Sequence, residues 1–297
     1  MLGLRCALIL CATSFVTALE LNAQDVAFHL FTSRTYPQSQ RIFPNMQSIM
    51  NSDFHPLQRT IVTIHTNGET VAGNFNAFVV KAHVESADVN VIAVDWSVGS
   101  RMYTQGLGNA PQCGAIIADF INFFIVSRLQ DVSLMRFVGV GLGAQVAGIA
   151  ARNVLGPLPH IVALDPALVG WTYNPHQLTK SDAEIVEVIH TTAGIQGYDY
   201  PLGDIDFYPN GGSRQNGCAE ILTCSHQMSF VFYAESISVE LTQGNRFVGT
   251  RCNTYEQAII GECNGERDAI FGGIDAEKKP SGIYHFETNS AQPFARG

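Results

Sequence analysis

A glycine-dense stretch near the middle of this 297-residue chain constrains the fold more than any other feature. The apolar run 136–140 leads into the sequence Gly139-Val140-Gly141-Leu142-Gly143, and small residues then recur at helical spacing as far as position 151. This pattern predicts a strand, a sharp turn and a closely packed helix. Two kinds of chemistry use that shape, and they require different residues at the turn.

The first is the nucleophile elbow G-x-S-x-G, whose middle residue stands at the apex of the turn and attacks the substrate. Here the apex is Gly141, which has no oxygen to attack an ester, so the covalent step of acyl transfer would be missing. The second is the dinucleotide fingerprint G-x-G-x-x-G/A, matched by Gly139, Gly141 and Ala144, in which backbone N–H groups hold a pyrophosphate. The motif alone also fits a turn without chemistry.

The first 18 residues have the features of a signal peptide. Arg5 precedes an apolar run at 6–16, and small residues at 16–18 suit a cleavage site. We therefore expect a secreted protein in which residues 19–297 form one domain, with no later stretch long and apolar enough to anchor it in a membrane. The formal net charge of −9 disfavours nucleic acid as a partner.

Strand and helix patterns alternate along the rest of the chain. Helical spacing is found around 75–84, at 113–129 after a break at 106–112, and beyond the elbow, whereas apolar runs of strand length lie at 26–32, 59–65, 89–96, 136–140, 160–164 and 184–190. This alternation predicts a mostly parallel sheet with helices on both faces. Chemistry gathers at the carboxyl ends of such strands, and the residues at those ends are His65, Asp95, Gly141, Asp165 and His190.

Three residues follow the chain order nucleophile, acid, base of an α/β hydrolase, namely Gly141, Asp165 and His226. Asp165 leaves its strand directly into proline, which we expect to hold it in an extended corner. His226 comes just before an apolar stretch at 228–233 that can pack as a helix. Taken singly, Asp165 fits an ordinary turn after a strand, and His226 fits a partly buried surface histidine.

From about residue 26 to its end, the chain resembles the pancreatic-lipase family of secreted lipases and phospholipases A1. The elbow G-V-G-L-G-A-Q-V-A-G is similar to that family's G-H-S-L-G-A-H-V-A-G, and V-A-L-D-P-A is similar to its acid motif. The stretches V-I-A-V-D-W, V-I-H-T, D-I-D-F-Y-P-N-G-G and P-F-A-R-G also match. The resemblance implies a single α/β-hydrolase domain without the family's C-terminal β-sandwich. It places Asp165 at the triad acid, His226 at the base and Gly141 where the family has its serine.

The resemblance also implies an oxyanion hole. Its donors would be the backbone N–H groups of Asn67 and Leu142, although the family's H-G-F turn is replaced here by His65-Thr66-Asn67.

Four cysteines match family-like disulfides, Cys218 with Cys224 and Cys252 with Cys263, which leaves Cys113 unpaired. A buried thiol is favoured for Cys113 over an intermolecular bridge. The first pair encloses only residues 219–223, a loop that can project about 10 Å. Such a loop is too short to cover a triglyceride pocket and resembles the phospholipase A1 branch.

The leading hypothesis is a serine-less member of this family that binds or stores a lipid-like molecule in its acyl groove, as the fly yolk proteins resemble lipases without the serine. One alternative is an active phospholipase A1 or ester lipase that uses another group; Ser225 lies beside His226 but not on the elbow. A remote alternative is a dinucleotide-binding oxidoreductase with Asp165 as its acidic residue.

We expect no cofactor and no metal. His65, His160 and His190 form no cluster with cysteine or carboxylate at ligand spacing, so structural roles are favoured for them. Asp204 and Asp206 are weak candidates for calcium, because the loop offers few other oxygens in sequence.

Overall fold

The structure is a computed structural model that describes residues 21–274 and 280–297, so the predicted signal peptide lies outside the described residues. Its centre is a sheet of eleven strands in the order β10-β9-β11-β8-β7-β6-β5-β3-β4-β1-β2. The strands are β1 (Ala27–Phe31), β2 (Gln40–Ile42), β3 (Thr60–Ile64), β4 (Asn90–Asp95), β5 (Met135–Val140), β6 (His160–Leu164), β7 (Ile185–Ile189), β8 (Ile205–Pro209), β9 (Val248–Cys252), β10 (Arg267–Ile270) and β11 (Gly282–Phe286).

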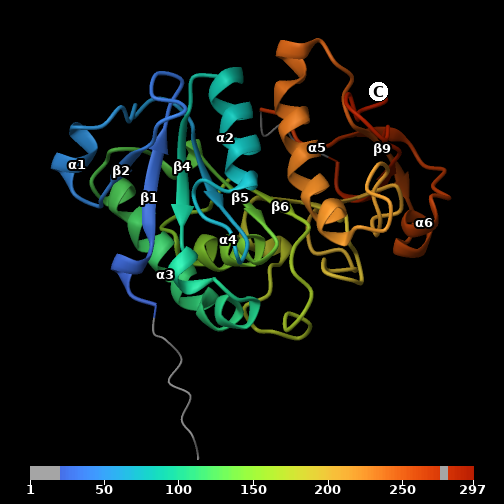
Figure 1. Ribbon diagram of the computed structural model, residues 1–297, viewed down its shortest axis with the longest axis horizontal. Helices are drawn as coiled ribbons and strands as arrows, with labels where there is room; N and C mark the ends of the chain where they lie inside the picture. Colours follow the sequence, from blue (N-terminus) through green and yellow to red (C-terminus); the bar gives the residue numbers. More distant parts are fainter. Residues whose placement is uncertain (1–20, 275–279) are drawn as a thin grey trace, which may run out of the picture.

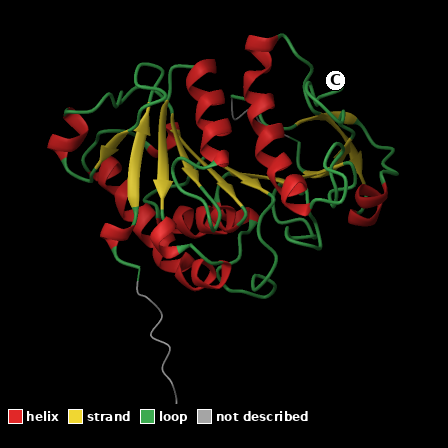
Figure 2. Cartoon of the chain, in the orientation of Figure 1, coloured by secondary structure: helices red, strands yellow, loops and turns green. Residues whose placement is uncertain are grey.

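Helices cover both faces of this sheet (Figure 1). The α-helices are α1 (Met46–Met50), α2 (Asn74–Ser86), α3 (Tyr103–Val126), α4 (Leu142–Asn153), α5 (Leu222–Thr242) and α6 (Tyr255–Ile260). Helices α3 and α4 pack together on one face, and α2 and α5 pack together on the other (Figure 2). Each face has its own core, one containing Trp96 and Trp171 and the other Phe75 and Phe232. The predicted α/β-hydrolase architecture is confirmed.

The middle of the sheet is parallel. Neighbouring strands run parallel from β4 through β3, β5, β6, β7 and β8 to β11, and antiparallel strands close both edges. Every residue of β3, β5 and β6 is buried, because helices cover both of their faces. In register, Gly139 of β5 lies between Ile64 of β3 and Ala163 of β6. The segments that follow these three strands therefore meet at one point.

Helix α3 corrects one expectation from the sequence. It begins at Tyr103 and runs through the stretch 106–112 that was expected to break the chain, with Pro111 inside the helix. Contacts with other elements explain why. Gly106 packs so closely on α4 that a Cβ there would lie 2.8 Å from Leu142 Cδ1, and Asn109 Nδ2 donates to Gly99 O at 2.8 Å. This packing outweighs the weak helix propensity of glycine and proline.

The same helix bears on the membrane expectation. By length and composition alone, Tyr103–Val126 could cross a membrane, so the expectation that no later stretch is long and apolar enough is wrong on that criterion. Half of its apolar window is buried inside the protein. Burial of that kind is usual for the core helix of a globular domain.

Both family-like disulfides form, Cys218–Cys224 and Cys252–Cys263. Cys113 is free and fully buried on α3, where burial raises the pKa of its thiol well above the usual value. The thiol there acts as a small apolar group in the core.

Candidate active site

The elbow joins β5 to α4, and its apex is Gly141. This residue has φ 57° and ψ −118°, and at a positive φ of this kind any residue with a Cβ is strained. Its N–H donates to Leu164 O at 3.0 Å, and its carbonyl accepts from Ala167 N at 3.1 Å. The turn is also tight, because a Cβ on Gly143 would lie 2.0 Å from Ile64 O. Gly143 is therefore required for the shape of the elbow, whatever chemistry the elbow carries.

The predicted acid lies at the end of β6 and is fully buried. Asp165 Oδ1 accepts from the N–H groups of Thr191 at 2.8 Å and Thr192 at 2.9 Å. Its Oδ2 accepts from the Thr192 hydroxyl and lies 2.6 Å from His226 Nδ1. Burial by itself would raise the pKa of Asp165, but the hydrogen bonds and the charge of His226 outweigh it and hold that pKa below its usual range.

The backbone of Asp165 differs from the expectation. Its φ is 46°, so it is left-handed rather than extended. Aspartate tolerates this region better than most residues. The bonds from Thr191 and Thr192 to its side chain, together with the bond from Asp165 N to Ile189 O at 2.8 Å, hold it there.

The predicted base lies in the first part of α5, just after the short disulfide loop. His226 Nδ1 faces Asp165, and its side chain is 17% exposed. Its other ring nitrogen points to the elbow, since a Cβ added to Gly141 would lie 3.2 Å from Nε2. The structure thus brings together Gly141, Asp165 and His226, and Gly141 has no side-chain oxygen.

One of the two predicted oxyanion donors, Leu142 N, lies at the elbow and is engaged by the side chain of Thr66. Leu142 N donates to Thr66 Oγ1 at 3.3 Å, and the Thr66 hydroxyl donates to Asn67 Oδ1 at 3.2 Å. Thr66 Oγ1 would lie only 2.4 Å from a Cβ on Gly141. From the sequence, Thr66 stood out only as the residue at the position where the family has a glycine. The contact of its hydroxyl with the elbow depends on the pairing of β3 with β5 and has no local signal.

His65 takes a structural role. His65 is fully buried, its Nδ1 lies 2.7 Å from Thr66 O, and its Nε2 accepts from Trp96 N at 3.2 Å. These partners assign the tautomer with the proton on Nδ1. The ring therefore holds the loop after β3 against the loop after β4 and does not face the elbow.

The other candidate residues are engaged elsewhere. His190 Nε2 lies 2.9 Å from Asp206 Oδ1, and His160 Nε2 lies 3.2 Å from Glu187 Oε2. The two aspartates considered for calcium accept backbone N–H groups, Asp204 from Val186 and Asp206 from Leu202 and Gly203. Within residues 21–274 and 280–297, no group of three or more histidine, cysteine or acidic residues could hold a metal ion.

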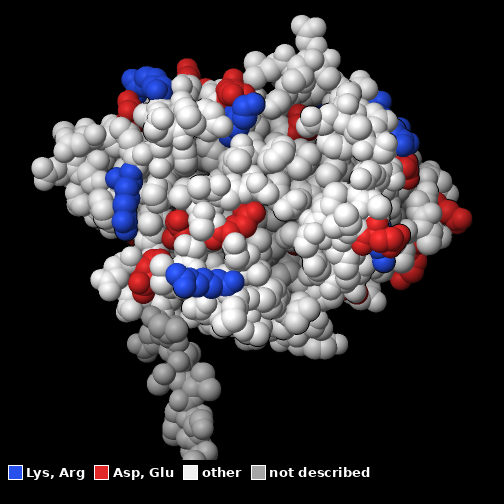
Figure 3. Space-filling model, viewed as in Figure 1, with Lys and Arg blue, Asp and Glu red and all other residues white. Residues whose placement is uncertain are grey.

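Exposed apolar side chains surround the carboxyl ends of the strands. We call them the apolar rim: they lie after β4, after β6, after β7 and before α5, and comprise Val98, Met102, Val169, Tyr173, Ile195 and Ile221. Tyr103 Oη donates to Val169 O at 2.6 Å, and Leu168 N donates to Gln196 O at 3.0 Å, so these loops contact one another. On the face shown in Figure 3, charged side chains form small mixed groups between wide areas that carry neither sign.

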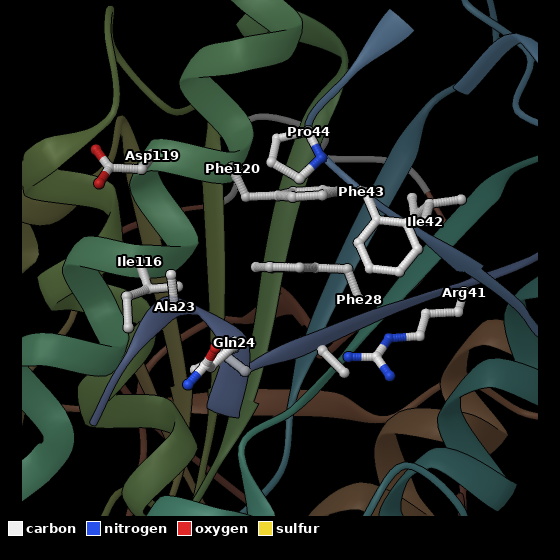
Figure 4. Close-up of a pocket in the computed structure, with 12 residues that line it drawn as sticks. Ala23, Gln24, Phe28, Arg41, Ile42, Phe43, Pro44, Ile116, Asp119 and Phe120 are labelled. Carbon is white, nitrogen blue, oxygen red and sulfur yellow. The ribbon is translucent and has the colours of Figure 1, made fainter. Parts of the chain in front are cut away.

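A separate cavity of about 380 Å³ lies at the β1–β2 edge of the sheet against α3 (Figure 4). The rings of Phe28 and Phe120 stack in it with centroids 3.6 Å apart, and Phe43 and Pro44 close one side. Its lining comes from residues 23–44 and α3 and includes none of the three elbow-site residues.

Comparison with known proteins gives the family. The sequence model described as "Lipase" matches residues 7–294. The chain is 32% identical to "Phospholipase A1 1" of Polistes dominula, over 92% of this chain and 85% of that protein. It is 31% identical to "Pancreatic triacylglycerol lipase" of Cavia porcellus, over 82% of this chain and 57% of that protein. It is 32% identical to "Lipase member H" of Oryctolagus cuniculus, over 84% of this chain and 56% of that protein.

The chain thus spans somewhat more than half the length of these two mammalian relatives and most of the length of the wasp protein. Its sheet, its elbow and the match along nearly all its residues agree with one another. The chain belongs to the lipase family, among the relatives of pancreatic triacylglycerol lipase.

Proposed function

We propose that this protein is a secreted lipid-binding member of the lipase family that has lost serine hydrolysis. One observation carries the proposal. His226 Nε2 lies 3.2 Å from the point where a side chain on Gly141 would begin, and Gly141 has no side chain. His226, which Asp165 supports as a base, therefore faces an apex with no hydroxyl from which it could take a proton.

The chemical consequence is the loss of covalent catalysis. Acyl transfer in this geometry needs an oxygen nucleophile whose proton passes to the histidine. When the nucleophile is missing, binding and oxyanion donors leave about 10³–10⁴-fold acceleration over water in well-studied serine hydrolases. That is far below the rate of a working lipase.

The lipid ligand is supported by the apolar rim and by the family. The rim places large apolar side chains around the carboxyl ends of the strands, including Met102 at 66% exposed and Val169 at 59% exposed. Exposed apolar patches of this kind mark contacts with apolar ligands, membranes or proteins. The disulfide loop at 218–224 is short, which leaves the rim without a long cover from that loop. Secretion rests on the signal-peptide features of residues 1–18.

An active phospholipase A1 is the second candidate, favoured by the similarity to the wasp protein over most of both chains. It requires a replacement nucleophile. Ser225 does not qualify, because it is buried and its Oγ accepts from Gln215 N at 3.0 Å. The dinucleotide alternative is disfavoured, since the first N–H of α4, which would bind the pyrophosphate, donates to Thr66 Oγ1.

The first test measures hydrolysis by the purified natural protein on phosphatidylcholine vesicles and on p-nitrophenyl butyrate. We expect the same background rate from the natural protein and from His226→Ala. Turnover by the natural protein that disappears in His226→Ala, with both proteins folded, would reject the proposal and favour the active enzyme.

The second test measures lipid binding. We expect mass spectrometry of the natively purified protein to detect bound lipid, and a fluorescent fatty-acid analogue to bind with an affinity that falls at least about tenfold in Met102→Glu. Leu57→Glu is the matched control, because Leu57 is also apolar and largely exposed but lies outside the rim, in the loop before β3. Equal affinities for the two variants would contradict a ligand at the rim.

A further inference from the structure

We propose that Thr66 is a built-in plug of the hydrolytic site, whose hydroxyl occupies both the space of the missing serine and the oxyanion hole. The inference rests on the proposed function and extends it to a second residue. Hydrolysis is then blocked twice, once by the absence of an oxygen on Gly141 and once by the presence of one on Thr66.

The first part of the argument is steric. A Cβ on Gly141 would lie 2.4 Å from Thr66 Oγ1 and 3.0 Å from Thr66 Cβ. The first distance is well inside van der Waals contact. Threonine is stiff at χ1, and a change of rotamer would move its oxygen but not its Cβ. A serine at the apex therefore cannot be seated while Thr66 keeps its position.

The second part concerns the oxyanion hole. Its predicted donor Leu142 N already donates to Thr66 Oγ1 at 3.3 Å. A transition-state oxygen binds where such donors converge, and an occupied donor contributes nothing to it. The hydroxyl itself donates to Asn67 Oδ1 at 3.2 Å, so its proton is directed away from His226. Thr66 is thus held as a filler of the site and is not aligned as a nucleophile.

Both observations arise from one feature of the fold. Residues 66 and 142 follow β3 and β5, which are parallel neighbours in the sheet, with Ile64 paired to Gly139. The hydroxyl that a lipase carries on the β5 side is here supplied from the β3 side. It follows that a ligand's polar end would meet His226 and not the N–H of Leu142.

The experiment is a two-by-two set in the full chain: the natural protein, Gly141→Ser, Thr66→Gly and the double variant. Hydrolysis of p-nitrophenyl butyrate and covalent labelling by a fluorophosphonate are measured. We expect the double variant to be at least about 100-fold more active than Gly141→Ser, since restoring an oxyanion donor is worth that much in serine hydrolases. A further control, Gly141→Ser with Thr66→Val, keeps the volume of the plug without its hydroxyl and should stay near Gly141→Ser.

A readout without activity tests the oxyanion part directly. In Thr66→Gly, the Leu142 amide loses its acceptor, and we expect its hydrogen exchange to quicken at least about tenfold, with thermal midpoints confirming that all variants fold. Activity of Gly141→Ser within threefold of the double variant overturns the plug, as does an inactive double variant or unchanged Leu142 exchange. Hydrolysis by the natural protein would instead overturn the proposed function, so the two failures are distinguishable.

Discussion

The two halves of the candidate site differ in what their side chains supply. In the acid–base half, Asp165 Oδ2 lies 2.6 Å from His226 Nδ1, and two backbone N–H groups donate hydrogen bonds to the other carboxylate oxygen of Asp165. In the nucleophile half, the apex has no side chain, and the Thr66 hydroxyl takes up the donor that would bind the oxyanion. On the proposed function, only the acid–base half retains the groups that ester hydrolysis needs.

The difference shows that an intact dyad is weak support for catalysis. Asp165 is fully buried, and a buried carboxylate is stable only when hydrogen bonds and opposite charge surround it. Its partners are therefore needed for folding whether or not the protein hydrolyses esters. The apex is different, because glycine at a positive φ removes about 1–3 kcal/mol of backbone strain. In a protein that does not hydrolyse esters, stability favours keeping the dyad and losing the serine.

The largest effect should come from the acid–base half. We expect Asp165→Ala to lower the free energy of unfolding by about 3–5 kcal/mol, because Thr191 N, Thr192 N and His226 would lose a buried partner together. Urea denaturation measures this change in the free energy of unfolding. The control is Asp88→Ala, at an exposed carboxylate that accepts from Ser33 Oγ, with an expected change within about 0.5 kcal/mol. A loss below about 1 kcal/mol for Asp165→Ala would remove the folding explanation for the dyad.

A smaller effect is expected at the apex. Gly141→Ala should cost about 1–3 kcal/mol, since it adds a Cβ at positive φ against Thr66 Oγ1. Gly108→Ala is the matched control, because a Cβ there meets nothing within 4 Å and should stabilise α3 by up to about 1 kcal/mol. Adding Thr66→Gly should recover more than about 0.5 kcal/mol of the cost at position 141. Additive effects at 66 and 141 would mean that the two residues do not contact each other.

The same contrast separates what could be predicted from the sequence from what could not. In the parallel centre, β3, β4, β5, β6 and β7 were predictable, because strands covered on both faces are continuous apolar runs. The parallel strands β8 and β11 were not predicted, although β8 is fully buried, because Asp206 and Pro209 interrupt its apolar run. The antiparallel strands β9 and β10 at one end of the sheet were not predicted either, since Val248–Cys252 and Arg267–Ile270 are short and partly exposed and carry no clear period.

Within the site, the order of Gly141, Asp165 and His226 was visible along the chain, and the structure brings all three together. The role of Thr66 was not visible. Residues 66 and 142 meet only through the pairing of β3 with β5, and a hydrogen bond between segments so far apart leaves no trace in local spacing.

The smallest effect is a pH dependence that belongs to the acid–base half alone. The pKa of Asp165 is held below its usual range by His226, Thr192 and Thr191, although burial opposes the shift. A carboxylate with a lowered folded-state pKa contributes stability above its unfolded value of about 3.9 and loses it as the pH falls through that value toward the folded one. The free energy of unfolding of the natural protein should therefore fall more steeply below about pH 4 than that of Asp165→Asn, by at most about 1.4 kcal/mol per pH unit.

Urea denaturation at a series of pH values measures both slopes, with Asp88→Asn expected to follow the natural protein. Parallel curves for the natural protein and Asp165→Asn would show that the Asp165 carboxylate gains nothing from its partners, and the acid–base half would then need catalysis to explain its retention.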